Sequence, residues 1–284
     1  MKLSYRTQAN AQAIAAIYNK PLDKPDWFKI VAAKDNEEAQ ILLFDYVGWP
    51  YNDPRDLILA LSDMGDVLVR INSPGGDVFD GASIFNALTS HKGNVTTRIE
   101  GLAASIASVI AMAGKKVQAY DNTMLMIHNA WTIMVGNQYE MRDVADLLEK
   151  IDGNILDAYQ KKTKLAKRDI TEMMKNTTWM TAKEAKEKGF VDAIVDGKSV
   201  KADFNLSIFA NLPDDYKEDR ELTERDAEKI LRDAGFSRHK AKAVLAGCKD
   251  GEGQADKDEQ DAKELVEYLT IASELKKVTA ILHA

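Results

Sequence analysis

Two side chains in the middle of the chain could together perform nucleophilic chemistry. Ser105 lies in the small-residue run Gly101–Gly114, and His128 follows the apolar residues Met124–Ile127. A serine hydroxyl is a weak nucleophile until a base takes its proton, and histidine is well suited to that task near neutral pH. Each residue also has an ordinary interpretation, because serine often caps a helix and a histidine at a strand end is usually structural.

A glycine pair could supply hydrogen-bond donors to such a nucleophile. Ser73-Pro74-Gly75-Gly76 directly follows an apolar segment, and glycines there let backbone N–H groups point into open space. Together with the free N–H groups at a helix start, such donors favour a developing oxyanion. The ordinary alternative is a plain turn. A fourth feature, residues 178–194, would by itself pass as a helix with solvated charges.

Alternating strands and helices must position these residues. Short apolar runs bounded by turns predict strands, and apolar residues at intervals of three and four predict helices. We expect strands over residues 39–48, 66–72, 94–100, 117–120, 124–129 and 190–197. We expect helices over residues 55–64, 78–92, 101–114, 137–162 and 169–175, and a strand end plus a helix over 178–189. This alternation indicates an α/β fold.

The chain divides into four predicted regions. Residues 1–38 form an N-terminal arm, and regular structure begins at Ala39. Residues 39–200 form the main domain, 201–221 a linker, and 222–284 an acidic helical tail that is weakly able to build its own core. The tail is either an exposed helical extension that packs on a neighbour or stays mobile, or a scaffold-like or self-cleaved segment that recruits the protein into a growing shell. If the protein processes itself, the polar stretch 249–261 is the expected cutting site.

Composition excludes several classes of protein. The net charge of −7 argues against a general nucleic-acid binder, which would need clustered basic residues. One cysteine allows no disulfide framework, and with four scattered histidines it argues against a zinc site. No apolar run reaches the ~18 residues of a membrane span, and the N-terminal residues have no signal-peptide core. No phosphate-binding glycine motif is present. We therefore expect a cytoplasmic protein without metal, cofactor, nucleic acid or membrane partner.

In their order along the chain, the four features resemble the ClpP-like serine proteases, and within that superfamily the phage head-maturation (prohead) protease group. The resemblance covers residues 39–196. It is carried by INSPGGDVFDGASIFNAL, GLAASIAS, MIHNA and WMTAKEAKEKGFVDAI. It implies an α/β fold of the ClpP/crotonase-like kind, a spiral of ββα units, to which this chain adds a C-terminal helical extension.

The resemblance also implies a role for each matching residue. Ser105 would be the nucleophile and His128 the general base, which takes the serine proton and later gives it to the leaving amine. The backbone N–H groups of Gly76 and Ile106 would form the oxyanion hole. The segment after the glycine pair would bind substrate backbone as an added strand. The helix that begins at Asn137 would help to assemble a ring-like homo-oligomer.

One position departs from the family pattern. Where the family has the acid that orients the histidine, this sequence has Thr177. A hydroxyl accepts the imidazole N–H but does not stabilise an imidazolium as a carboxylate does, and loss of a triad acid costs on the order of 10⁴ in rate in a known case. Asp169 or Glu172 could substitute in space, the enzyme could work as a slow Ser–His pair, or the domain could be catalytically weak and serve assembly. We favour a working Ser–His pair.

Three functions follow from these alternatives. The first is a serine endopeptidase that cuts scaffold and capsid proteins during phage head maturation, in the host cytoplasm or inside the procapsid. The second is a catalytically weak or inactive assembly and scaffold module with the same fold. The third, an acyl-CoA hydratase or isomerase, is disfavoured because that class usually needs carboxylates at its reacting centre. A membrane-bound signal-peptide peptidase is disfavoured because no membrane segment is predicted.

Overall fold

A computed structural model describes residues 8–17, 22, 28–31, 38–134, 136–197, 204, 206 and 208–213. The chain divides into two compact units, Met1–Tyr216 and Lys217–Ala284. The second unit lies outside the described residues, as do the helical tail predicted over residues 222–284 and most of the predicted linker. In the described ranges, no helix has the length and apolar character that crossing a membrane would require.

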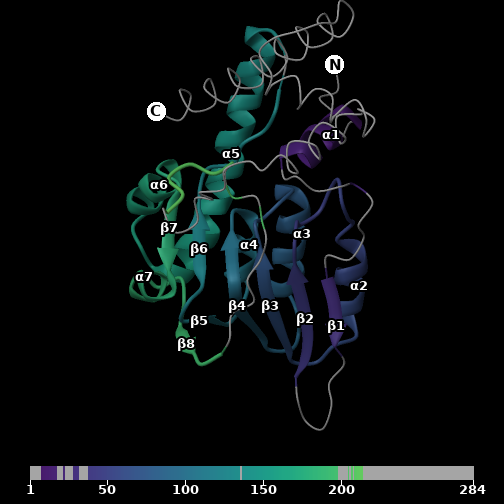
Figure 1. The fold of residues 1–284 in the computed structure, drawn as a ribbon, viewed down its shortest axis with the longest axis vertical. Helices are drawn as coiled ribbons and strands as arrows, with labels where there is room; N and C mark the ends of the chain where they lie inside the picture. The colour runs from purple at the N-terminus through teal and green to yellow at the C-terminus, as the bar shows by residue number, and fades with distance from the viewer. Residues whose placement is uncertain are drawn as a thin grey trace, which may run out of the picture. The chain divides into compact units, whose positions relative to one another are not determined.

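Helices and strands alternate along the first unit (Figure 1). The helices are α1 (Gln8–Ile17), α2 (Arg55–Ser62), α3 (Val78–Thr89), α4 (Ile106–Ala111), α5 (Gln138–Thr163), α6 (Lys167–Lys175) and α7 (Ala182–Glu187). The strands are β1 (Phe28–Val31), β2 (Ala39–Phe44), β3 (Val67–Ser73), β4 (Val95–Ala104), β5 (Lys116–Tyr120), β6 (Met124–Ile127), β7 (Thr178–Thr181) and β8 (Ala193–Val195).

All eight strands belong to one sheet in which parallel pairs predominate. The main path runs β1-β2-β3-β4-β5-β8, and only β1 in this path is antiparallel to its neighbour. Strand β4 pairs with β5 over Thr96–Ile99 and then with β6 over Leu102–Ala104. Strand β7 extends this branch antiparallel to β6. The predicted α/β class is confirmed.

The core lies between the sheet and the helices. Along β3 the side chains of Val67, Val69 and Ile71 are fully buried, and they pack in one apolar cluster with Ile84 of α3 and Ile110 of α4. Figure 1 shows α2, α3 and α4 behind the sheet in that view. Burial of this face of the sheet is the main apolar driving force for the fold. The same packing holds β3 and β4 in place, and the candidate site lies at the ends of these strands.

The N-terminal region contains more regular structure than the sequence predicts. Helix α1 and strand β1 both precede Ala39, so the prediction that regular structure begins there is wrong. Strand β1 pairs antiparallel with β2, from Phe28 opposite Leu43 to Val31 opposite Gln40. It has four residues without a clear alternation of apolar and polar side chains, so only its pairing with a distant strand defines it.

The predicted helix over Gly101–Gly114 is also wrong in its first part. Residues 101–104 continue β4, and α4 begins only at Ile106. Ala103 and Ala104 are fully buried and pair with Leu125 and Met126 of β6. Small side chains allow this close packing, so the composition fits a buried strand as well as a buried helix. The boundary between strand and helix therefore falls at Ser105.

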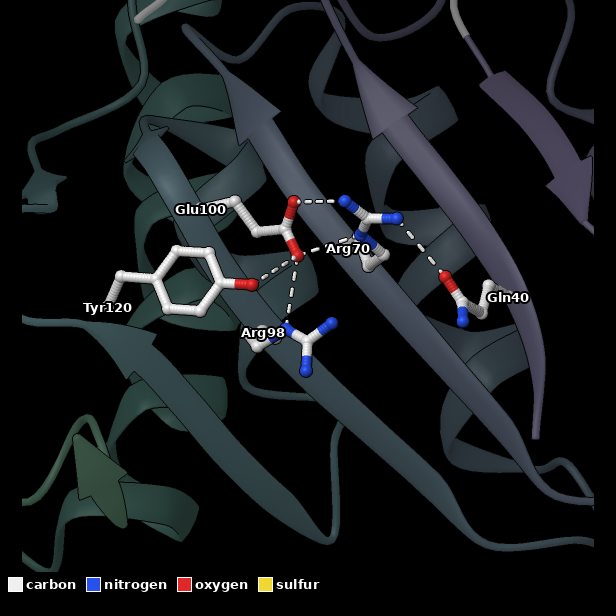
Figure 2. Close-up of polar contacts among 5 residues, drawn as sticks. All are labelled: Gln40, Arg70, Arg98, Glu100 and Tyr120. Atoms are coloured by element: carbon white, nitrogen blue, oxygen red, sulfur yellow. Dashed lines mark hydrogen bonds and ion pairs between the residues drawn. The ribbon is translucent and has the colours of Figure 1, made fainter. Parts of the chain in front are cut away.

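The opposite face of the sheet carries a buried ionic network (Figure 2). The fully buried Glu100 carboxylate of β4 accepts two hydrogen bonds of 2.7 Å from Arg70 of β3, one to each oxygen. It also accepts from Arg98 Nε at 3.0 Å and lies 3.4 Å from the Tyr120 hydroxyl of β5. Arg70 donates further to Gln40 of β2 at 3.1 Å. The network thus joins four neighbouring strands.

We predict that Glu100→Gln destabilises the fold by about 2–3 kcal/mol, because it leaves the two arginines without their shared anion. Both arginine side chains retain about a quarter of their exposure, 26% and 22%, so solvent limits the loss. Urea denaturation measures the change. The matched control is Lys167→Gln, which breaks an exposed ion pair with Asp157 and should cost less than about 0.5 kcal/mol. Equal losses in the two variants would contradict the assigned role of Glu100.

Candidate active site

Ser105 forms a sharp turn between β4 and α4. Its backbone has φ 54° and ψ −132°, a region that costs a non-glycine residue free energy. Its N–H donates to Met126 O of β6 at 3.0 Å, and its carbonyl accepts from the Ser108 N–H at 3.0 Å. The Ser105 side chain makes no capping hydrogen bond to α4. Ser105 thus occupies the N-cap position of α4, but its hydroxyl does not cap the helix and is directed elsewhere.

The Ser105 hydroxyl lies against His128. His128 Nε2 is 2.8 Å from Ser105 Oγ, a hydrogen-bond distance. The two residues meet because β4 and β6 are parallel neighbours, with Ala104 opposite Met126, and each residue lies just past the end of its strand. The imidazole is half-buried. This arrangement allows the imidazole to take the proton of the hydroxyl.

A buried chain of hydrogen bonds stabilises the turn at Ser105. Ser108 Oγ donates to Ser105 O at 2.5 Å and lies 2.7 Å from the Tyr159 hydroxyl of α5. Because the Ser108 proton is directed to Ser105, Tyr159 is the donor to Ser108. Burial raises the pKa of Tyr159, and the hydrogen bond to Ser108 opposes this shift. Tyr159 therefore remains protonated and able to donate.

Helix α5 also holds the segment that follows His128. Asp152 accepts a hydrogen bond from Asn129 Nδ2 at 2.5 Å and another from the Ala130 N–H at 2.7 Å. Burial raises the pKa of Asp152, while these two hydrogen bonds lower it in part. The acid thus anchors the backbone directly after the histidine.

The loop that contains Gly75 and Gly76 pairs with Val47 in a short parallel β-bridge. The Val47 N–H donates to Gly75 O at 2.8 Å, and the Asp77 N–H donates to Val47 O at 2.7 Å. This pairing skips the N–H of Gly76. Ser73 fixes the loop, since its hydroxyl donates to the Asp45 carbonyl at 2.6 Å and accepts from the Gly75 N–H at 3.1 Å.

Both glycines are required by close backbone approaches. Gly75 has φ 99°, and a Cβ there would lie 2.6 Å from Ser105 Cβ and 3.2 Å from Ile106 N. Gly76 has φ 155°, and a Cβ there would lie 2.0 Å from Val47 O. Among the hydrogen bonds of the described residues, neither the Gly76 N–H nor the Ile106 N–H is a donor. Both N–H groups therefore stay candidates for the predicted oxyanion hole.

Thr177, the predicted third position, makes no side-chain hydrogen bond to His128 in the described residues. Thr177 lies in the turn before β7 with φ 46°, and its N–H donates to Met174 O at 3.1 Å. Asp169 and Glu172 are exposed on α6. Within the described part of the chain, no hydrogen bond links any of these three side chains to His128. The structure thus brings Ser105, His128 and the glycine loop together, and the antiparallel register, with Ile127 opposite Thr178, places Thr177 near the same strand end.

The sequence analysis missed the supporting residues Ser108, Asp152 and Tyr159, and it also missed Phe209. The Phe209 ring lies edge-to-face against the His128 imidazole, with ring centroids 5.4 Å apart and an angle of 88°. Phe209 falls in the region predicted as a linker over residues 201–221. The only signal in the sequence is a short group of apolar residues there, Phe204, Leu206, Ile208 and Phe209, and nothing local pairs that group with a histidine.

Fold and site together define a mixed α/β domain with a serine–histidine pair at the ends of parallel strands. The sequence model of the family described as Clp protease matches residues 54–198, and the chain belongs to this family. The matched range includes Ser105, His128 and both glycines. Phe209 lies beyond it.

Two relatives carry the name "ATP-dependent Clp protease proteolytic subunit". The chain is 31% identical to the one from Deinococcus radiodurans over 133 residues, which are 46% of this chain and 65% of that protein. It is 30% identical to the one from Lactococcus lactis subsp. lactis over 146 residues, which are 50% of this chain and 73% of that protein. The chain thus spans just under two thirds of the first relative.

We predict that Gly76→Ala destabilises the fold by about 2–3 kcal/mol, because the added methyl group overlaps a backbone oxygen that cannot move without breaking the loop pairing. The matched control is Gly153→Ala on α5, where a Cβ would meet nothing within 4 Å. This control should stabilise the protein by about 0.5–1 kcal/mol through helix propensity. Chemical denaturation compares the two variants, and a stable Gly76→Ala protein would refute the assigned contact.

Proposed function

We propose that this chain is a serine endopeptidase of the ClpP type. The observation that carries the proposal is the 2.8 Å hydrogen bond between His128 Nε2 and Ser105 Oγ, made by a serine that does not cap its helix. The strained turn exposes this hydroxyl at the end of a strand, as nucleophilic serines require. Membership of the Clp protease family supports the same chemistry.

The residues suggest a definite order of steps. His128 Nε2 takes the proton of Ser105 Oγ while the oxygen attacks the scissile peptide carbonyl. The negative charge that forms on the carbonyl oxygen is stabilised by the N–H groups of Gly76 and Ile106. The imidazolium then gives its proton to the leaving amine, and an acyl-enzyme remains on Ser105. Water, activated by the same imidazole, releases the acyl group and restores the serine.

Thr177 limits the rate of this proposed enzyme. That position holds a hydroxyl where the family has a carboxylate, so Thr177 itself gives the imidazolium no charge stabilisation. We infer a slow Ser–His pair, which is sufficient for a protein that cuts few bonds in one event. This departure is also the observation that favours the second candidate, an assembly module that retains the fold with little or no activity.

We predict that a fluorophosphonate probe labels the wild-type protein at one serine and does not label Ser105→Ala. His128→Ala should label on the order of 10³-fold more slowly or not at all, because the base is gone. Ser83→Ala, which removes an exposed hydroxyl on α3, serves as the matched control and should label like the wild type. Intact-protein mass spectrometry detects the adduct. Equal labelling of wild type and Ser105→Ala would exclude Ser105 as the nucleophile.

We also propose that the protein forms a ring-like homo-oligomer. Large apolar side chains are exposed in the segment after His128 and on the first half of α5, at Trp131, Ile133, Tyr139, Met141 and Leu147. Exposed apolar groups of this kind mark protein interfaces. Protein chains are the proposed substrates, bound as an added strand beside the glycine loop.

The biological setting that we propose is phage head maturation, with scaffold and capsid proteins as substrates in the host cytoplasm or inside the procapsid. This finer proposal rests on the resemblance of the four sequence segments and on the acidic C-terminal region. Co-expression with the scaffold and capsid proteins of the same phage tests it. We predict that the wild type shortens them, whereas Ser105→Ala leaves them at full length in particles that stall before maturation.

Gel analysis and electron microscopy of the particles provide the measurement. Normal, fully processed particles with Ser105→Ala would overturn the protease role and favour the assembly module. Unprocessed scaffold and capsid proteins in both samples would overturn the phage setting while leaving the probe result as the test of the chemistry.

A further inference from the structure

A segment beyond the family-matched range packs against the catalytic end of the sheet. Its apolar residues form a small cluster with the last residues of β4 and with β6, on the sheet face opposite the main core. The buried members of this cluster are Leu102, Ala104, Met124, Met126 and Phe209, and Phe204, Leu206, Ile208 and Trp179 pack against them. The cluster covers the strand ends that carry Ser105 and His128.

Hydrogen bonds fix this segment in place. Trp179 Nε1 of β7 donates to Ala210 O at 3.1 Å, and Asn211 Nδ2 donates to Asn176 O at 2.6 Å. The Phe209 N–H closes a turn by donating to Leu206 O at 3.1 Å. Phe209 is held on both sides of its sequence position and is only 6% exposed.

The ring of Phe209 lies between two aromatic partners. Its centroid is 5.4 Å from that of His128 at 88°, and 6.1 Å from that of Trp179 at 69°. Edge-to-face contacts of this geometry are attractive beyond their burial. The indole N–H of Trp179 is hydrogen-bonded, so Trp179 is held in place and restricts movement of the Phe209 ring. The Phe209 ring in turn restricts movement of the imidazole.

We propose that Phe209 is a positioning residue that holds the His128 imidazole within hydrogen-bond distance of Ser105 Oγ. In a triad, the acid performs two tasks: it orients the imidazole and stabilises its positive charge. A packed ring performs the first task by restricting rotation of the imidazole, and it does not perform the second. This inference rests on the proposed protease function and gives a segment outside the matched family range a part in orienting His128.

The experiment compares Phe209→Ala with two variants. Leu206→Ala removes an apolar side chain from the same cluster and leaves the Phe209 ring in place, and Phe209→Tyr retains the ring. We expect Phe209→Ala to lower kcat for a fluorogenic peptide by about 10- to 100-fold, since small misplacements of a catalytic group have effects of that order. KM should remain within about twofold, because Phe209 positions the base and does not bind substrate. Leu206→Ala and Phe209→Tyr should keep kcat within about threefold of the wild type.

Crystal structures of wild type, Phe209→Ala and Leu206→Ala provide a second measurement that needs no activity. We expect His128 Nε2 to leave hydrogen-bond distance of Ser105 Oγ in Phe209→Ala alone. An unchanged imidazole in Phe209→Ala, or a kcat equal to that of Leu206→Ala, would overturn the proposal. A kcat above that of the wild type would also overturn it and show that the ring blocks substrate. If the wild type neither hydrolyses peptide nor binds the probe, the protease function fails, and the crystal structures still decide the positioning role.

Discussion

Strand β4 and helix α4 are joined by a single residue, Ser105, and the conformation of this residue constrains the arrangement of the site. A backbone with φ 54° at a non-glycine residue costs on the order of 1–3 kcal/mol, so it persists only where neighbours hold it. Here Met126 O accepts a hydrogen bond from the Ser105 N–H, and Ser108 donates two hydrogen bonds to the Ser105 carbonyl, from its N–H and its hydroxyl. The turn is thus fixed by β6 on one side and by its own helix on the other. The hydroxyl is left to His128.

The glycine loop follows from the same constraint. The turn at Ser105 lies at the strand end, and the neighbouring glycine loop approaches it closely. Gly75 allows this approach, because a Cβ there would overlap Ser105 Cβ. Gly76 allows the loop to pair with Val47 on its far side. Close contacts exclude a Cβ at both positions, so the fold itself sets the backbone that carries the proposed oxyanion donors.

The sequence predicts the elements that short-range patterns determine, and it misses those that depend on pairing between distant segments. Two elements appear as predicted: the strand that ends at the glycine turn near Asn72–Gly76, and the long helix after Asn137. Turn-forming residues determine the first, and the spacing of apolar residues determines the second. The strand character of Gly101–Ala104 was missed, because pairing with β6 overrides a composition that suits a helix equally. Strand β1 was missed for the same reason. Phe209 could not be predicted, because its partner His128 is distant in sequence and the contact depends on how the segment packs across the sheet.

Helix α5 links the two halves of the site. Asp152 and Tyr159 lie two helical turns apart on one side of this helix; the first holds the backbone after His128, and the second holds Ser108 beneath Ser105. The spacing of serine and histidine is therefore set by a rigid element as well as by the β4–β6 pairing. Orientation and charge stabilisation are separable tasks in a serine–histidine site. In this chain α5 and the β4–β6 pairing fix the spacing of Ser105 and His128, and we propose that Phe209 adds to the orientation of the imidazole. Thr177, in place of the family's acid, offers a hydroxyl and no charge at its own position, so the slow Ser–His protease that we propose would depend mainly on orientation.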